Sequence, residues 1–211
     1  MKKEPQIVVV HNGKGGVGKT TTTMGLAAIL AEKYQVSVVD TDEQGSCTWW
    51  ASRGEMPFNC IQMTKPEDLR NLKQLQGYNL ILVDTPPALR ATALAAMIDI
   101  ADYVVLPSPC APMDLVALIQ TVQEVVSPTK IPHRVLFTKV DSRSLGEAIE
   151  AQNQLMSLGI PTCHSFVRAY KAHERAALEG ATVVQMRGKQ AREAEADYRR
   201  VADELQRDWR N

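Results

Sequence analysis

Residues 13–20 constrain the fold of this chain more than any other stretch. They read Gly-Lys-Gly-Gly-Val-Gly-Lys-Thr and match the phosphate-loop pattern G-x-x-x-x-G-K-[ST] at every fixed position. The β-branched run at 6–11 is typical of a buried strand, and 20–34 has the apolar spacing of a helix. A strand, a glycine loop and a helix in that order are the context that the pattern requires.

The residue types in this loop fit a polyphosphate. Consecutive backbone N–H groups surround phosphate oxygens only where no Cβ blocks the approach, and the next helix points its positive dipole end at the same place. Lys19 is spaced to reach the β- and γ-phosphates, and the Thr20 hydroxyl to ligate Mg²⁺. We therefore predict a nucleoside triphosphate site. Its expected contacts are Gly13, Lys14, Gly15, Gly16, Val17, Gly18, Lys19, Thr20 and Thr21.

Length and charge narrow the class of protein. The chain has 211 residues, long enough for one substantial core, and 24 basic residues balance 24 acidic ones. The chain has no net charge that would attract it to nucleic acid or to a membrane, so such binding would need a local basic patch. Its four scattered cysteines lack metal-ligand spacing, and neither a signal segment nor an apolar run of about 18 residues is present. We expect a cytoplasmic protein.

Strands and helices alternate along the whole chain, which predicts a single α/β domain over 1–211. Its doubly wound, mostly parallel sheet would carry helices on both faces. Ser144 and Glu147 have the spacing of a capping box before a helix. The expected strands are 6–11, 36–40, 59–63, 80–84, 103–106, 134–138 and 162–166. The expected helices after 20–34 are one through Trp49 and Trp50, 66–75, 89–100, 113–126, one after Ser144, 171–179 and 190–209.

Carboxylates follow two of these strands. Asp40 and Asp42 end the strand at 36–40, and Asp84 ends the strand at 80–84. In open α/β sheets, ligands bind beyond the carboxyl ends of the strands, so these side chains should face the phosphate loop. Carboxylates there can hold the waters of Mg²⁺ or orient an attacking water. A helix cap after each strand is the alternative role.

Three motifs together carry a family resemblance. Residues 14–20, the Asp40-x-Asp42-x-Gln44-Gly45 segment and residues 84–87 resemble the deviant Walker A loop and the two switches of the ParA/MinD ATPases. The proline-rich loop at 107–114 is similar to that of the small ParF-type partition ATPases. The likeness covers nearly the whole chain.

The resemblance implies roles for these residues, with ATP and Mg²⁺ as cofactors. Lys14 would reach across an ATP-bound homodimer to the partner's phosphates, while Lys19 acts within its own subunit. Thr20, Asp40 and Asp84 would hold Mg²⁺, and Asp42 would position the hydrolytic water. Glu43 replaces the usual proline of this segment, which puts the geometry of Asp42 in doubt.

The base is less well defined by the sequence. Residues 138–141, Thr-Lys-Val-Asp, resemble the Asn-Lys-x-Asp signature that reads guanine in GTPases, so Asp141 is a candidate guanine contact. Asp141 can equally be a strand-end residue, and the family resemblance implies ATP. Thr138 is expected to contact the nucleotide in either case.

A basic cluster lies near the C-terminus. Between 168 and 192 the chain has six basic residues against Glu174 and Glu179, the pattern of non-specific binding to a phosphate backbone. A solvated basic face is the alternative. The expected DNA contacts are Arg168, Lys171, Arg187, Lys189 and Arg192.

The resemblance implies an ATPase of weak basal activity that dimerises on ATP, binds DNA non-specifically and positions a plasmid, chromosome or other cargo. A ParB-type or other adaptor protein would stimulate it, and it would be nucleoid-associated. A MinD-like membrane-cycling ATPase is the first alternative, although acids are interspersed along the last helix. A nitrogenase iron-protein-type carrier would need a cysteine between 84 and 100, where the sequence has none. A biosynthetic ligase of this fold would need a small-molecule pocket, for which the sequence gives no sign.

Overall fold

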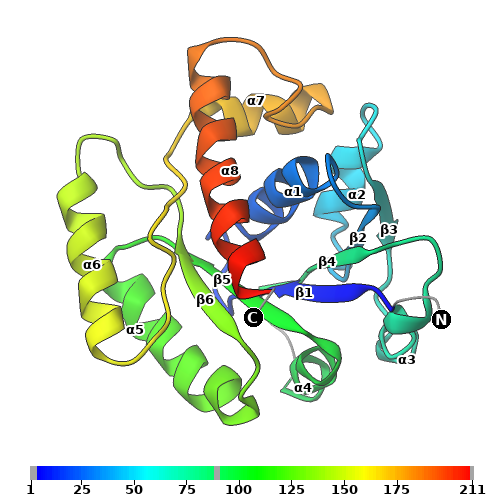
Figure 1. Ribbon diagram of the computed structural model, residues 1–211, viewed down its shortest axis with the longest axis horizontal. Helices are drawn as coiled ribbons and strands as arrows, with labels where there is room; N and C mark the ends of the chain where they lie inside the picture. The colour runs from blue at the N-terminus through cyan, green and yellow to red at the C-terminus, as the bar shows by residue number, and fades with distance from the viewer. Residues whose placement is uncertain (1–3, 88–90, 210–211) are drawn as a thin grey trace.

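The computed structural model describes residues 4–87 and 91–209, and a six-stranded parallel sheet forms its centre (Figure 1). The strand order is β3-β2-β4-β1-β5-β6, and every neighbouring pair is parallel. The predicted α/β class and parallel sheet are confirmed. The strands are β1 (Gln6–Val10), β2 (Val36–Asp40), β3 (Asn59–Gln62), β4 (Leu80–Asp84), β5 (Tyr103–Ser108) and β6 (His133–Phe137).

Helices cover both faces of the sheet because successive strand residues point to opposite sides. In β1, Val8 and Val10 join one apolar core, and Ile7 and Val9 join the other. The first core is closed by α1 (Lys19–Leu30), α2 (Ser46–Ala51), α7 (Lys171–Glu179) and α8 (Lys189–Asp208). The second is closed by α3 (Pro66–Leu69), α4 (Ala91–Ile100), α5 (Pro112–Thr121) and α6 (Leu145–Ser157).

Helix α8 packs against α1 and is the longest helix of the described residues (Figure 1). The predicted apolar stripe is buried from Ala191 to Leu205, so it serves as core. The contact is close: a Cβ on Gly25 of α1 would lie 2.5 Å from the ring of Tyr198. None of the helices within 4–87 and 91–209 is both long and apolar enough to cross a membrane.

The predicted strand at 162–166 is wrong. Backbone hydrogen bonds tie Cys163 and Val167 to β6, but within 162–166 the one bridge joins Thr162 to Val135. Side chains take backbone groups in between. The Gln152 amide donates to the carbonyls of Cys163 and His164. Glu204 of α8 accepts from the amides of His164 and Ser165. The segment therefore follows the edge of β6 as an irregular cover.

Helix boundaries account for the other differences. The capping box is wrong, because Ser144 makes no side-chain hydrogen bond at the start of α6. The helix expected at 66–75 is divided into α3 and a 3₁₀ turn at Leu72–Gln74. Helix α5 continues beyond Thr121 as a π-helical turn, Val122–Val126. For the helix expected at 89–100, residues 89 and 90 lie outside the described residues.

Candidate nucleotide site

The phosphate loop joins β1 to α1 at the carboxyl edge of the sheet. Gly16 and Gly18 have φ of +72° and +92°, which a side chain would disfavour, and Gly18 caps α1. The loop borders a cavity of about 400 Å³. Asp42, Thr85 and Lys139 from three other strand ends also line this cavity. The structure thus brings the predicted loop and strand-end residues to one place.

Two hydrogen bonds from side chains fix the backbone of the phosphate loop. The Lys19 ammonium donates to the carbonyl oxygen of Lys14 at 2.9 Å, and the Thr138 hydroxyl donates to that of Val17 at 2.7 Å. Burial lowers the pKa of Lys19, while Asp84 and Asp42 oppose this shift. Thr138 thus supports the loop from β6, and the Lys19 ammonium stands where it can exchange a carbonyl for a phosphate oxygen.

Lys14 does not point at its own cavity. Its ammonium pairs with a carboxylate oxygen of Asp114, in the first turn of α5, at 2.6 Å. The Lys14 side chain is 48% exposed, while that of Asp114 is 13% exposed. Lys14 is therefore held at the surface beside the loop, by the last residue of the proline-rich segment 107–114.

Asp84 is buried beneath the loop and gathers three donors. The hydroxyls of Thr20 and Thr23 donate to it at 2.7 and 3.1 Å, and the Cys47 thiol at 3.3 Å. Burial raises the pKa of Asp84 to about 6, and the nearby Asp40 adds to that rise. The carboxylate pair therefore carries negative charge that its surroundings do not fully compensate, which favours a cation there.

Asp40 holds helix α2 instead of facing the cavity directly. One of its oxygens accepts from the backbone amides of Cys47 and Thr48 at 2.8 and 3.0 Å. Its other oxygen accepts from the amide of Asp42 at 3.1 Å. The capping alternative for Asp40 thus describes its hydrogen bonds in this structure.

Asp42 sits on a closed turn even though Glu43 replaces the proline of the family pattern. The amide of Gly45 donates to the carbonyl of Asp42, and the amide of Gln44 donates to its Oδ1, both at 2.9 Å. Gly45 adopts φ +63°, which supplies the reversal. The turn leaves Asp42 lining the phosphate cavity.

The donor set fits Mg²⁺ bound together with phosphate. Within the described residues, no group of three or more His, Cys, Asp or Glu side chains could hold a metal ion by itself. Mg²⁺ commonly keeps several waters and takes one or two carboxylates plus substrate phosphates. The Thr20 hydroxyl, which lines the phosphate cavity, and the Asp84 carboxylate beneath it, 2.7 Å apart, supply such a partial set.

A second cavity, of about 530 Å³, continues from Gly18 and Thr21 toward α7 and α8. Its far wall is the segment 167–171, which the sequence motifs did not mark as part of the site. Asp141 is not among the residues that line it, and its carboxylate accepts from the exposed Arg143 guanidinium at 2.7 Å. These hydrogen bonds lower the pKa of Asp141 to about 2. The carboxylate that would read guanine is thus engaged elsewhere.

His11 supports the loop after β4. Thr85 donates its hydroxyl hydrogen to the carbonyl of Val10, so its oxygen accepts from Nδ1–H of His11 at 3.0 Å. Burial, with a contribution from Lys19, lowers the pKa of His11 to about 4. His11 is therefore a neutral side chain in this structure at physiological pH.

We expect His11 to make the protein less stable in mild acid. In the unfolded chain the His11 imidazole takes up a proton near pH 6.5, and in the folded chain only near pH 4. The free energy of unfolding therefore decreases as the pH is lowered from 6.5 to 4. From pH 7 to pH 5 the loss should be about 2 kcal/mol. Urea unfolding of wild type and His11→Asn measures it, because the variant lacks this titration.

The effect of His11 is the difference between wild type and His11→Asn in how the free energy of unfolding depends on pH. The raised pKa of Asp84 gives a slope of opposite sign between about pH 6 and pH 4, and both proteins share that slope. An identical pH dependence in wild type and His11→Asn would contradict the prediction.

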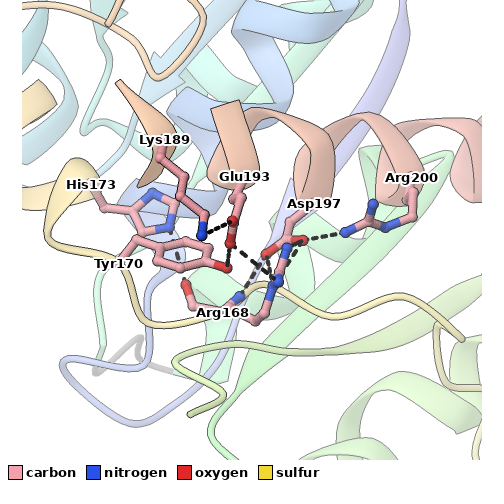
Figure 2. A network of polar contacts seen from close by, with 7 residues as sticks. All are labelled: Arg168, Tyr170, His173, Lys189, Glu193, Asp197 and Arg200. Atoms are coloured by element: carbon pink, nitrogen blue, oxygen red, sulfur yellow. Dashed lines mark hydrogen bonds and ion pairs between the residues drawn. The ribbon is translucent and has the colours of Figure 1, made fainter. Parts of the chain in front are cut away.

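The predicted basic residues divide into two groups. Arg168 lies between its own loop and α8, and its guanidinium donates to the fully buried Asp197 (Figure 2). Arg200 pairs with the same carboxylate, and Tyr170 donates to Glu193. The remaining members are exposed. They are Lys171, Arg175, Arg187, Lys189 and Arg192.

Comparisons with known proteins agree with this architecture. The model of the CobQ/CobB/MinD/ParA nucleotide binding domain matches residues 8–183. The maintenance of carboxysome distribution protein A of Gloeobacter kilaueensis is 60% identical over 208 residues, which cover 98% of this chain and 96% of that protein.

Two solved structures share the fold. A complex of Cyanothece McdA with ATP has a TM-score of 0.74 at 16% identity, and the match covers 97% of each chain. The septum site-determining protein MinD of Pyrococcus horikoshii, complexed with Mg-ADP, has a TM-score of 0.77 at 19% identity. That match covers 95% of this chain and 96% of the MinD chain.

Proposed function

This chain belongs to the CobQ/CobB/MinD/ParA nucleotide-binding family, and from that premise we propose that it is a ParA-type positioning ATPase. It binds ATP with Mg²⁺, dimerises on ATP and attaches non-specifically to DNA. A partner protein stimulates its slow hydrolysis, and hydrolysis releases both the dimer and the DNA. The γ-phosphate thus acts as a population switch between dimer and monomer.

The position of Lys14 is the observation that carries this proposal. The loop has two lysines, and only Lys19 is turned inward against the loop carbonyls. Lys14 stands half-exposed outside its own cavity, paired with Asp114. A lysine in this position can contact the phosphates of a nucleotide bound to a facing subunit, which supports a site shared by two copies.

Within one copy, the residues divide the chemistry. Lys19 and the loop amides neutralise phosphate charge, and Thr20 and Asp84 hold Mg²⁺, with Asp40 next to them. The bound Mg²⁺ supplies charge stabilisation to the phosphates. Asp42, on its closed turn at the rim of the cavity, orients the attacking water. The base enters the larger cavity beside Thr138, and we propose adenine because Asp141 is occupied by Arg143.

The exposed basic residues around the start of α8 support DNA binding. Lys189 lies in the first turn of α8, with only a weak contact to Glu193 at 3.9 Å, and Arg192 is one turn further. We leave Arg168 out of this surface, because the buried Asp197 holds its guanidinium. Two copies in a dimer would present two such surfaces to one duplex.

Charge reversal tests the function. In Lys189→Glu/Arg192→Glu, ATP-dependent affinity for random-sequence duplex DNA should fall at least about tenfold, because phosphate contacts dominate such binding. Basal ATPase activity should be unchanged. Lys33→Glu/Arg207→Glu is the matched control, with two exposed basic residues reversed elsewhere.

The assay uses ATP, GTP and ADP arms with duplex DNA at several salt concentrations. Equal DNA affinity in both double variants would remove the α8 surface from the proposal. DNA binding or dimerisation that GTP supports better than ATP would overturn the choice of adenine.

We propose a protein compartment as the cargo. The support is the relative at 60% identity, whose name refers to carboxysome distribution. Plasmid partition and a ParB-type partner, suggested by the likeness to ParF-type ATPases, form the second possibility. The adaptor is tested as a stimulator of hydrolysis: the cargo's own adaptor should raise the ATPase rate, and a plasmid centromere-binding protein should not.

A membrane-cycling ATPase is the competing function. It would need an apolar helix face available to lipid, whereas the stripe of α8 is buried against α1. Co-sedimentation with anionic vesicles in the presence of ATP discriminates between the two, and we expect the protein to remain in the supernatant.

A further inference from the structure

Helix α2 ends in a tight joint against the end of α7. A Cβ on Gly54 would lie 2.2 Å from the carbonyl oxygen of Gly180, so backbone packs directly on backbone there. The Trp50 indole donates to the carbonyl of Ala181, and the Gln185 amide donates to that of Glu55, both at 2.8 Å. The end of α2 is therefore fixed against the segment that leads into α8.

Arg53 stands on this joint in a defined orientation. Its Nε donates to the carbonyl of Leu178 at 3.0 Å, and its guanidinium carbon lies 4.9 Å from the centre of the Trp49 ring. Within the described residues, its two terminal nitrogens have no hydrogen-bond partner. Trp49 and Leu178 are 49% and 61% exposed. The structure thus presents an oriented guanidinium whose terminal N–H groups remain available for a ligand, at an exposed position.

Arg53 continues the line of exposed basic residues. Leu178, which it contacts, follows Arg175 by three residues on the exposed side of α7. Arg175 in turn lines a small groove together with Arg187 and Lys189. Basic side chains therefore extend from the start of α8 across α7 to the end of α2.

Acidic residues lie along this line too. Glu179 pairs with Arg175 at 3.0 Å, and Glu55 is exposed beside Gly54. Arg53 is not engaged by either of them in the structure. Its two outward nitrogens suit the planar geometry of a phosphate oxygen pair, and the flat Trp49 ring beneath it limits its motion.

We propose that Arg53, oriented by Trp49, extends the DNA-binding surface onto α2 and contacts the phosphate backbone of duplex DNA. The inference rests on the DNA binding in the proposed function. It adds a structural connection between the DNA-binding surface and the nucleotide site. Asp40 caps the start of α2 next to the nucleotide site, and Arg53 follows its last turn. One short helix therefore runs from the edge of the nucleotide site to the proposed DNA contact.

The test measures DNA affinity against salt for the ATP-bound protein. Arg53→Ala should weaken binding to random-sequence duplex about three- to tenfold at moderate salt. It should also lower the slope of log K against log salt by about 0.9 for each phosphate that the variant no longer neutralises. Arg53→Lys should keep most of the slope, because the charge remains. Arg70→Ala, an exposed arginine after α3, is the matched control and should resemble wild type.

Nucleotide affinity and basal hydrolysis are measured on all four proteins and should be equal, which excludes a folding defect. An unchanged slope in Arg53→Ala with wild-type DNA binding intact would overturn this inference and leave the proposed function standing. Absence of ATP-dependent DNA binding by wild type would overturn both. Binding of wild type to anionic vesicles, abolished in Arg53→Ala, with no effect on DNA, would assign the surface to membrane and also overturn the inference.

Discussion

Lys14→Gln should bind ATP about as well as wild type and lose partner-stimulated hydrolysis by at least about 100-fold. The Lys14 ammonium contributes nothing to its own cavity in this structure, since it pairs with Asp114 at 2.6 Å. In a two-copy site it would instead stabilise the negative charge that develops on the facing nucleotide. Equilibrium binding of a fluorescent ATP analogue and the steady-state hydrolysis rate with the stimulating partner measure the two effects separately.

Asp114→Asn is the matched control for this experiment. It removes the same ion pair and keeps the lysine. If Lys14 acted only through this ion pair, both variants would lose stimulated hydrolysis to the same extent. We expect Asp114→Asn to retain stimulated hydrolysis and to dimerise on ATP at least as readily as wild type, because Lys14 is released. Full stimulated activity in Lys14→Gln would contradict the shared site.

Asp42→Asn should slow hydrolysis by about 100- to 10,000-fold while the ATP-bound dimer still forms. Asparagine keeps the Oδ1 atom that accepts from the amide of Gln44 at 2.9 Å, so the turn should persist. It loses the negative charge that would orient and polarise the attacking water. Single-turnover hydrolysis gives the rate, and size-exclusion chromatography with ATP gives the dimer, which should be longer-lived than that of wild type.

Glu43→Gln neutralises the neighbouring, exposed acid and should leave both measurements unchanged. A wild-type rate in Asp42→Asn would show that another group orients the water. Loss of the dimer in the same variant would indicate instead that the turn itself has moved.

Local chemistry explains why much of the architecture was predictable. The β-branched strands and the glycine loop are continuous in sequence, and each needs a particular residue type at fixed spacing. Asp40, Asp42 and Asp84 follow strands that lie side by side in the sheet, so the parallel arrangement alone brings them to one edge. The order of motifs was therefore sufficient to locate the phosphate cavity.

The remaining features depend on contacts between distant segments. Asp114 meets Lys14 only because the loop after β5 folds back beside the phosphate loop. Arg168 belongs by sequence to a basic cluster, yet a fully buried carboxylate from α8 takes its guanidinium. The run at 162–166 has the composition of a strand, but Gln152 and Glu204 take its backbone groups. No spacing rule predicts such partners, because each depends on how segments that are distant in sequence pack together.

The irregular cover along β6 also limits how copies of this chain can associate. An edge strand with unpaired amides and carbonyls is a template on which another chain can add its own strand. Here the cover takes backbone groups of Val135 and Phe137 in β6, so that edge is closed to such growth. Gln152 and Glu204 bind other backbone groups of the cover. Strand addition to the sheet is therefore blocked at β6, which is one of its two edge strands.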